Sequence, residues 1–264
     1  MSVFDRRRFE PRPCAARPVI GVLCCNEVSE RPIQAVATRF IEPLVTYAGV
    51  TVVLIPAVAS ACDAIALASR LDGLLLTGSR SNVAGVRYGI AGADTGPLDE
   101  QRDAVALELA ARMIETGRSV FGICRGLQEL NVLFGGTLSD ATPDHHHRGA
   151  SGTIGYEDLF DHHHDVDLLA GGLLARTTDA ARLTVNSVHR QGIDRLGAGL
   201  YVEARAADDG LIEAFSARPC GGDVLAVQWH PEWDAARSPA SRAFFQLIGE
   251  SLGNPPVLAQ GPPA

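Results

Sequence analysis

Residues 119–131 read SVFGICRGLQELN, in which an apolar run ends in a glycine-flanked cysteine and a helical pattern begins at once. The apolar run predicts a strand over 118–123 that is buried on both faces, and the pattern after it predicts a helix over 125–136. Cys124 falls at the corner, between Gly122 and Gly126. Because a Cβ at either glycine would clash with the tight backbone, this stretch predicts an abrupt, strained strand-to-helix turn.

The same alternation of strand and helix extends outward from this corner. Strands are predicted over 18–25, 50–57 and 71–79, and helices over 33–49, 62–70 and 98–117. This rhythm indicates an α/β fold: a doubly wound, mostly parallel sheet with helices on both faces. The second half differs, since LYVEARA, GLIEAFSA and DVLAVQWH are short strands separated by turns. They predict a small antiparallel portion, and a helix over 238–253 closes the pattern, with Ser238 as its N-cap.

The size of the chain suits one domain. Of 264 residues, 46% are hydrophobic, which is enough for one sizeable core. We expect a single domain over 18–252, with disordered tails at 1–17, which is rich in Arg and Pro, and at 253–264.

Charge and hydropathy exclude several classes of function. The formal net charge is −8, whereas a nucleic-acid-binding protein normally carries a basic face. No apolar run approaches the roughly 18 residues that span a bilayer, and the N-terminus lacks the apolar region of a secretory signal. The six cysteines do not have the spacing of a disulfide framework or a zinc ribbon. We therefore expect a cytoplasmic protein that binds neither nucleic acid nor membrane.

Cys124 is the first candidate for chemistry. In a parallel sheet, reactive groups lie beyond the carboxyl ends of the strands, which is where this corner falls. The helix that begins at Arg125 would stabilise a thiolate, and the Arg125 N–H would be available to a developing oxyanion. The alternative, an ordinary buried cysteine at the end of a strand, does not explain the two flanking glycines.

A thiol nucleophile needs a base, and the base needs a group that orients it. The stretch AVQWHPEW, residues 226–233, offers His230 after an apolar strand and Glu232 two residues later. If the backbone stays extended, as Pro231 favours, the two side chains share a face and the carboxylate can reach the imidazole. Alone, this pair could be a capping histidine beside a solvated glutamate, but the cysteine corner upstream makes a triad the better interpretation.

These motifs resemble the class I glutamine amidotransferase-like hydrolases, and within them the γ-glutamyl-γ-aminobutyrate hydrolases. The resemblance is carried by GICRGLQELNVLFGGTL and VQWHPEW, together with LLLTGSRSNVAGVRYG and VNSVHRQG, and it extends over roughly residues 18–250. It implies a flavodoxin-like fold and hydrolysis of a γ-glutamyl amide. It implies no metal and no cofactor.

The resemblance also implies roles for individual residues. Cys124 would be the nucleophile, His230 the general base and acid, and Glu232 the orienting carboxylate. The backbone N–H groups of Gly78 and Arg125 would form the oxyanion hole. The residues expected to contact the substrate are Gln128, Asn186, Ser187, Val188 and His189. The patterns themselves add that Gly78 ends a strand next to the cysteine strand and that Gln128 lies one helical turn after Cys124. The sequence patterns leave open whether His189 contacts substrate or is a structural histidine whose hydrogen bonds are all made within the protein.

Three classes of function remain. The favoured one is a hydrolase that acts on γ-glutamyl-γ-aminobutyrate or a related γ-glutamyl amine. The second is a glutaminase subunit that supplies ammonia to a separate synthetase, and the third is a non-catalytic binding relative, against which the intact Cys124, His230 and Glu232 argue. The amine half of the substrate is expected at residues 80–95 and at the histidine-rich segment 140–170, with Arg87 and Tyr88 as candidate contacts by their polarity. A homodimer is common among related folds, but nothing in the sequence requires one.

Two histidine triplets, His145–His147 and His162–His164, depart from the pattern of the family. Imidazoles suit zinc, copper or nickel, so a metal site is one interpretation. A solvated loop over the active site is the other, and it is the one we expect, because successive histidines in an extended loop point in opposite directions and the mechanism needs no metal.

Overall fold

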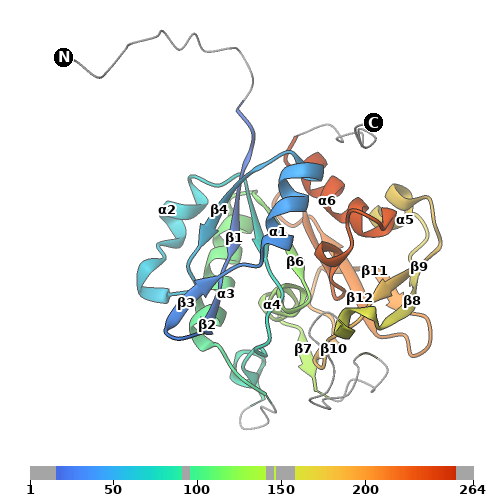
Figure 1. Ribbon diagram of the computed structural model, residues 1–264, viewed down its shortest axis with the longest axis horizontal. Helices are drawn as coiled ribbons and strands as arrows, with labels where there is room; N and C mark the ends of the chain where they lie inside the picture. The colour runs from blue at the N-terminus through green and yellow to red at the C-terminus, as the bar shows by residue number, and fades with distance from the viewer. Residues whose placement is uncertain (1–15, 91–95, 141–145, 147–157, 254–264) are drawn as a thin grey trace.

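The computed structural model describes residues 16–90, 96–140, 146 and 158–253 (Figure 1). The tails predicted to be disordered lie outside the described residues, apart from residues 16, 17 and 253. The prediction of one domain over 18–252 stays a prediction.

One sheet runs through the described part of the chain, in the order β4-β1-β5-β6-β13-β12-β11-β8-β9. The first five strands of that order are parallel to one another, and from β13 onward each neighbouring pair is antiparallel. The predicted fold class, a parallel doubly wound sheet with an antiparallel portion in the second half, is confirmed. The strands are β1 Val19–Leu23, β4 Thr51–Ile55, β5 Gly73–Leu76, β6 Ser119–Ile123, β8 His163–Leu168, β9 Arg182–Asn186, β11 Tyr201–Ala206, β12 Ile212–Ala217 and β13 Val224–Val227.

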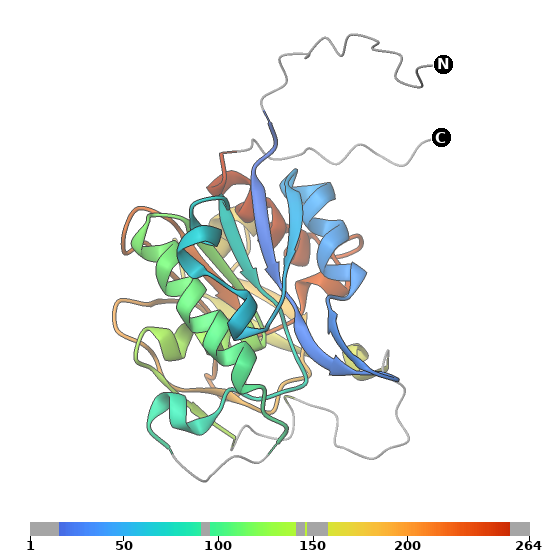
Figure 2. The same ribbon diagram turned by 90° about the vertical axis from the view of Figure 1, so that its left-hand side faces the viewer.

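Helices cover both faces of the sheet (Figures 1 and 2). One apolar cluster joins α2, α3 and α4 to one face, and a second joins α1, α5 and α6 to the other. Every residue of β5, β6 and β13 is buried, as expected for continuous apolar runs between two helical layers. The helices are α1 Thr38–Pro43, α2 Ala64–Ala68, α3 Glu100–Glu115, α4 Arg125–Leu133, α5 Leu173–Thr178 and α6 Pro239–Ser251.

The ends of the two longest helices follow their local sequence. The Asp99 side chain caps α3 by accepting from the Arg102 N–H at 3.0 Å, and Gly117 adopts a left-handed φ of 71° just after the helix. Ser238 caps α6, with Pro239 in the first turn, as predicted.

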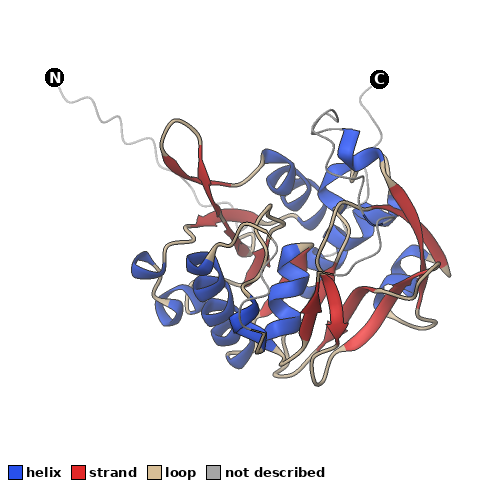
Figure 3. Ribbon diagram, turned by 90° about the horizontal axis from the view of Figure 1, so that it is seen from below, coloured by secondary structure: helices blue, strands red, loops and turns tan. Residues whose placement is uncertain are grey.

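The predicted helix over 33–49 is wrong at its start. Residues 32–35 form β3 (Pro32–Ala35), which pairs with β2 (Cys25–Val28) in an antiparallel hairpin that stands out from the body of the sheet (Figure 3). The helix begins only at Thr38, and Pro43 ends the α-helical part, after which Leu44–Ala48 form a π-helical turn. The Gln34 side chain anchors the hairpin by accepting from the Ala57 N–H at 2.7 Å, a contact that helical periodicity cannot reveal.

A second small sheet pairs β7 (Thr137–Ser139) with β10 (Gly192–Arg195). Among the described helices, none combines the length and the apolar character needed to cross a membrane. The carboxyl ends of β5, β6 and β13 meet at one edge of the main sheet, because these strands are adjacent and parallel. Gly78, Cys124 and His230 follow those three ends, and the candidate site is built there.

Candidate active site

Cys124 lies at the strained corner that the sequence predicts. It follows β6 directly, precedes α4, and has φ 51° and ψ −103°; Asp179 is the one other described non-glycine residue with a positive φ. A Cβ on Gly122 would lie 2.6 Å from the Gly126 carbonyl carbon, and a Cβ on Gly126 would overlap the Leu76 carbonyl. The glycines therefore allow β5, β6 and α4 to approach closely enough to hold this turn, which is the arrangement of a nucleophile elbow.

His230 and Glu232 are joined at the end of β13. The His230 Nδ1 lies 2.7 Å from the Glu232 Oε1, and both side chains are buried. The extended backbone predicted for this pair is wrong, since residues Pro231–Trp233 form a 3₁₀ turn. The carboxylate reaches the imidazole by curling back through that turn.

Gly78 brings this pair against the cysteine. A Cβ placed on Gly78 would lie 2.7 Å from the His230 Cε1 and 3.5 Å from the Cys124 Cβ, so the glycine backbone touches both side chains. Cys124 is also close enough to His230 to raise the pKa of the imidazole. A thiol, an imidazole and a carboxylate thus lie side by side.

The electrostatics favour the charged form of His230. Burial by itself would lower the pKa of His230, but the negative charges of Glu232 and Cys124 and the hydrogen bonds to both raise it well above its ordinary value. An imidazolium beside sulfur can transfer a proton to a leaving group without first acquiring one from water.

A cavity of about 440 Å³ opens above these groups. Four residues with predicted roles at the reacting bond, Gly78, Cys124, His230 and Glu232, lie on its wall, and so does Val188. The remaining wall residues are Cys25, Glu27, Ala35, Val36, Ala37, Arg39, Phe40, Thr77, Ser79, Arg80 and Phe160.

The other predicted substrate contacts lie away from this wall. The Gln128 Nε2 donates to the Gln191 carbonyl at 2.8 Å, the Ser187 hydroxyl donates to the His146 carbonyl at 2.8 Å, and Asn186 bonds to the main chain of His230. His189 faces Glu213. Their contact with substrate stays a prediction, because in this structure each of these side chains supports other protein groups.

Arg87 and Tyr88, the candidate contacts for the amine half, also lie off the cavity wall. Arg87 is exposed, with its guanidinium near the Glu100 carbonyl at 3.5 Å. The Tyr88 hydroxyl accepts from the Gln191 Nε2 at 3.3 Å. Of the segment expected to recognise the amine, residues 91–95 lie outside the described residues.

An aromatic stack that sequence patterns did not single out lies beside the cavity, with Phe160 on the cavity wall. Phe160 stacks on Trp233 at a centroid distance of 3.6 Å, and the Arg39 guanidinium lies 3.5 Å from the centre of the Trp233 ring. Phe160 also meets the His230 ring edge to face at 5.1 Å. The tryptophan beside His-Pro-Glu was visible in the sequence, but its partners come from α1 and from a turn near residue 160.

A buried charge network braces the corner from behind. The Arg102 Nε lies 3.0 Å from the Glu129 Oε1, and Arg125 contacts Glu129 and lies 2.7 Å from the Asp103 carboxylate. Arg125 also donates to the Ser81 carbonyl at 2.9 Å. Two cations and two anions balance, and they fix the loop after Gly78 to the start of α4, which are the two backbone segments proposed for an oxyanion hole.

Comparisons with known proteins agree with this geometry. The family model for peptidase C26 matches residues 18–232. The chain is 35% identical to the γ-glutamyl-γ-aminobutyrate hydrolase of Escherichia coli O157:H7, over 87% of this chain and 91% of the relative. It is 33% identical to a Mycobacterium tuberculosis protein provisionally named as a glutamine amidotransferase, over 83% and 70% of the two chains.

A solved structure supports the fold alone. A Thermoplasma acidophilum protein, provisionally described as one of the subunits of GMP synthase, superposes with a TM-score of 0.60 at 18% identity and covers 89% of this chain and 94% of its own. The family model spans residues 18–232, which include the cysteine corner and the His230–Glu232 pair, and the curated relatives cover most of the chain. The chain belongs to the peptidase C26 family of class I glutamine amidotransferase-like hydrolases.

Proposed function

We propose that this protein is a cysteine hydrolase that cleaves the γ-glutamyl amide bond of a small γ-glutamyl amine, with γ-glutamyl-γ-aminobutyrate as the favoured substrate. The observation that carries the proposal is the grouping of Cys124 and the hydrogen-bonded pair His230–Glu232 on the wall of one cavity. The hydrolase from Escherichia coli, at 35% identity, supports the substrate class.

The proposed reaction has two stages. The Cys124 sulfur attacks the γ-carbonyl carbon, and the backbone N–H groups of Gly78 and Arg125 stabilise the oxyanion. The C–N bond breaks as His230 gives its proton to the departing amine, which leaves a γ-glutamyl thioester on Cys124. His230 then takes a proton from water, whose oxygen attacks the thioester, and glutamate and the free thiol are released.

The charges on the cavity wall support a substrate with two carboxylates. Arg39 and Arg80 carry positive charge, and Glu27 carries negative charge. The substrate γ-glutamyl-γ-aminobutyrate has two carboxylates and one ammonium at neutral pH, which is the complementary set, whereas glutamine has one carboxylate fewer. This complementarity favours the larger substrate over glutamine.

Release of glutamate from γ-glutamyl-γ-aminobutyrate and from glutamine, measured in parallel, tests the proposal. We expect release from the first to exceed release from the second, and Cys124→Ala to lower kcat by at least about 10³-fold with the fold intact. Cys220→Ser, at an exposed cysteine, is the matched control and should keep full activity.

The other outcomes separate the alternatives. Rapid ammonia release from glutamine would favour a glutaminase subunit that serves a separate synthetase, in line with the name of the mycobacterial relative. No release from either compound would favour a non-catalytic binding protein. Wild-type turnover by Cys124→Ala would exclude the proposed nucleophile.

A further inference from the structure

Three histidines that are far apart in the sequence converge on one buried carboxylate. Glu213 lies on β12, and its side chain is surrounded by His146, by His164 on β8 and by His189, which precedes β10. The Nε2 of His189 is 3.2 Å from the Glu213 Oε1, the Nδ1 of His146 is 3.6 Å from the same oxygen, and the Nε2 of His164 is 3.7 Å from the Oε2. The triplets thus each supply one side chain to this cluster, and His189 supplies a third.

The rings of His189 and His146 each make a hydrogen bond on the side away from Glu213. That bond determines which ring nitrogen carries the proton, so the nitrogen that faces Glu213 has a free lone pair. The His189 Nδ1 lies 3.3 Å from the Gln191 carbonyl, which can only accept, so in the neutral ring the proton is on Nδ1. The His146 Nε2 lies 2.8 Å from the Asp209 carboxylate, so in the neutral ring the proton is on Nε2. In both rings the other nitrogen then directs its lone pair at the Glu213 carboxylate.

The inner atoms of the cluster lack hydrogen bonds. Within the described part of the chain, both oxygens of Glu213, the Nε2 of His189 and both ring nitrogens of His164 have no hydrogen-bond partner. The Glu213 side chain is fully buried, and a buried carboxylate without hydrogen bonds is costly. A cation placed among these converging lone pairs would supply the partner that their atoms lack.

We propose that His146, His189 and Glu213 bind a divalent transition-metal ion, with Zn²⁺ as the best-suited ion. Tetrahedral zinc at about 2.0 Å from its ligands places neighbouring ligand atoms about 3.3 Å apart. The Glu213 Oε1 lies 3.2 Å from the His189 Nε2 and 3.6 Å from the His146 Nδ1, which is close to that spacing. The Asp209–His146 and Gln191–His189 contacts match the outer hydrogen bonds that orient zinc-binding histidines.

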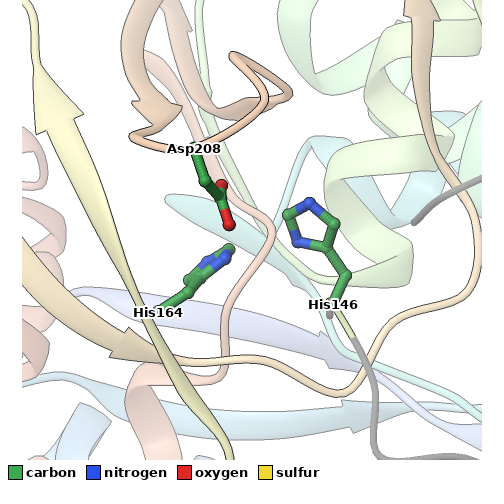
Figure 4. Close-up of side chains that lie close together, drawn as sticks. All are labelled: His146, His164 and Asp208. Atoms are coloured by element: carbon green, nitrogen blue, oxygen red, sulfur yellow. The ribbon is translucent and has the colours of Figure 1, made fainter. Parts of the chain in front are cut away.

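Asp208 lies at the exposed side of the cluster. Figure 4 shows its carboxylate directed toward the space between the rings of His164 and His146, and the ligand atoms of these three residues lie within 4.8 Å of one another. The ligand atoms of His146, His189 and Glu213 meet the same limit. We assign the site to the set of His146, His189 and Glu213, because all three of its residues are buried.

Three protein ligands leave one position of a tetrahedral zinc ion to water, and none of the three residues lies on the wall of the cavity that holds Cys124. The Glu213 carbonyl accepts from the Gln228 N–H at 2.7 Å, two residues before His230, and the Ser187 hydroxyl bonds to the His146 carbonyl. A bound ion would therefore tie together the segments that flank the proposed general base, and it takes no part in the proposed hydrolysis. This proposal departs from the solvated loop expected from the sequence.

Zinc stoichiometry and thermal unfolding of the untagged, full-length protein test the site. After chelator treatment and addition of ZnCl₂, we expect one Zn²⁺ per chain by elemental analysis, and a Tm higher by about 5–10 °C when zinc is 100-fold above its Kd. Glu213→Gln and His189→Gln should lose the bound zinc and the Tm increase. His163→Gln, which changes an exposed histidine next to His164, is the matched control and should retain both.

Zinc X-ray absorption keeps the test decisive if a variant folds poorly. We expect a shell of nitrogen and oxygen neighbours at about 2.0 Å with no sulfur in the wild-type protein. Less than stoichiometric zinc in the wild type, equal zinc in Glu213→Gln, or a sulfur ligand would overturn the proposal. Loss of zinc in His163→Gln alone would place the ion on the surface and would overturn it as well.

Discussion

Asn186 holds the backbone of His230 from both sides: its Oδ1 accepts from the His230 N–H at 2.9 Å, and its Nδ2 donates to the His230 carbonyl at 2.9 Å. Both residues are buried, and β9, which ends at Asn186, lies at the far edge of the main sheet from the parallel strands. The end of β9, in the antiparallel half of the sheet, thus holds the backbone of His230, which follows the parallel strand β13.

Asn186→Ala should therefore act on kcat more than on KM. The change removes two hydrogen bonds worth about 0.5–1.5 kcal/mol each, and it releases the backbone that aims His230 at Cys124. Misplacement of a reacting group by about 1 Å can cost about 10²-fold in rate. We expect kcat for γ-glutamyl-γ-aminobutyrate to fall by roughly that factor while KM changes little.

Asn186→Asp distinguishes a loss of His230 alignment from a loss of overall protein stability. Aspartate can still accept from the His230 N–H, but its second oxygen faces the His230 carbonyl, so activity should fall as in Asn186→Ala. A rise in KM with unchanged kcat in either variant would instead assign Asn186 to direct substrate binding, the role that the family resemblance implies.

The pH profile should depend on Glu232. Its charge is a main cause of the raised pKa of His230, together with that of Cys124 and against the effect of burial. The imidazolium must be present to protonate the leaving amine, so activity is lost as pH rises through the pKa of His230, and a raised pKa extends activity to higher pH. Glu232→Gln removes a negative charge, which lowers that pKa and moves the alkaline limb of kcat/KM to lower pH.

We also expect Glu232→Gln to lower kcat by about 10²–10⁴-fold, because the imidazole loses its orienting carboxylate. Glu232→Asp keeps the charge and is the control, with the alkaline limb close to that of the wild type. An unmoved alkaline limb in Glu232→Gln would show that His230 is not the group that titrates there.

The parts of the fold that were predictable are those set by local patterns. Continuous apolar runs identify β5, β6 and β13, and the clash at Gly122 and Gly126 follows from backbone geometry alone. The start of the helix over 33–49 was not predictable in this way. The β2–β3 hairpin is largely exposed, so burial gives its strands no pattern of period two, and it depends on the contact of Gln34 with Ala57.

The candidate site also contains residues that local sequence patterns predict and residues that they do not. Cys124, His230 and Gly78 follow adjacent parallel strands, so their meeting follows from the strand order. Arg39 and Phe160 reach the cavity only through tertiary packing of a short helix and a 3₁₀ turn, and no spacing in the sequence links them to His230.

Gly126→Ala should destabilise the protein, although alanine has a higher helix propensity than glycine. The new Cβ would overlap the Leu76 carbonyl, where neither backbone can give way without opening the sheet. We expect a loss of several kcal/mol, about 3 or more, in the free energy of unfolding, as for other severe steric changes in a core. Urea unfolding followed by circular dichroism measures it.

Gly135→Ala is the matched control for that experiment. Gly135 follows the same helix and has a left-handed φ of 79°, but a Cβ there meets no atom within 4 Å. Its cost is the backbone strain alone, about 1–2 kcal/mol. Equal losses in the two variants would mean that the contact between α4 and β5 does not limit stability.

The buried network should show strong coupling between Arg102 and Glu129. Both side chains are fully buried and lie 3.0 Å apart, and Arg125 and Asp103 complete a neutral set of four charges. Arg102→Met leaves the set with one excess negative charge, and Glu129→Leu leaves it with one excess positive charge. Each single change should cost about 3–5 kcal/mol in the free energy of unfolding, because an uncompensated charge stays buried.

The double variant, Arg102→Met with Glu129→Leu, leaves the neutral Arg125–Asp103 pair, so its cost should be smaller than the sum of the single costs by about 1–3 kcal/mol. The exposed pair Arg182–Asp167 provides the comparison, since its atoms are 2.7 Å apart but its side chains are 56% and 52% exposed. Arg182→Met should cost less than about 1 kcal/mol. Additive costs at Arg102 and Glu129 would show that Arg125 and the Thr77 carbonyl, rather than their mutual charge balance, determine the stability of this network.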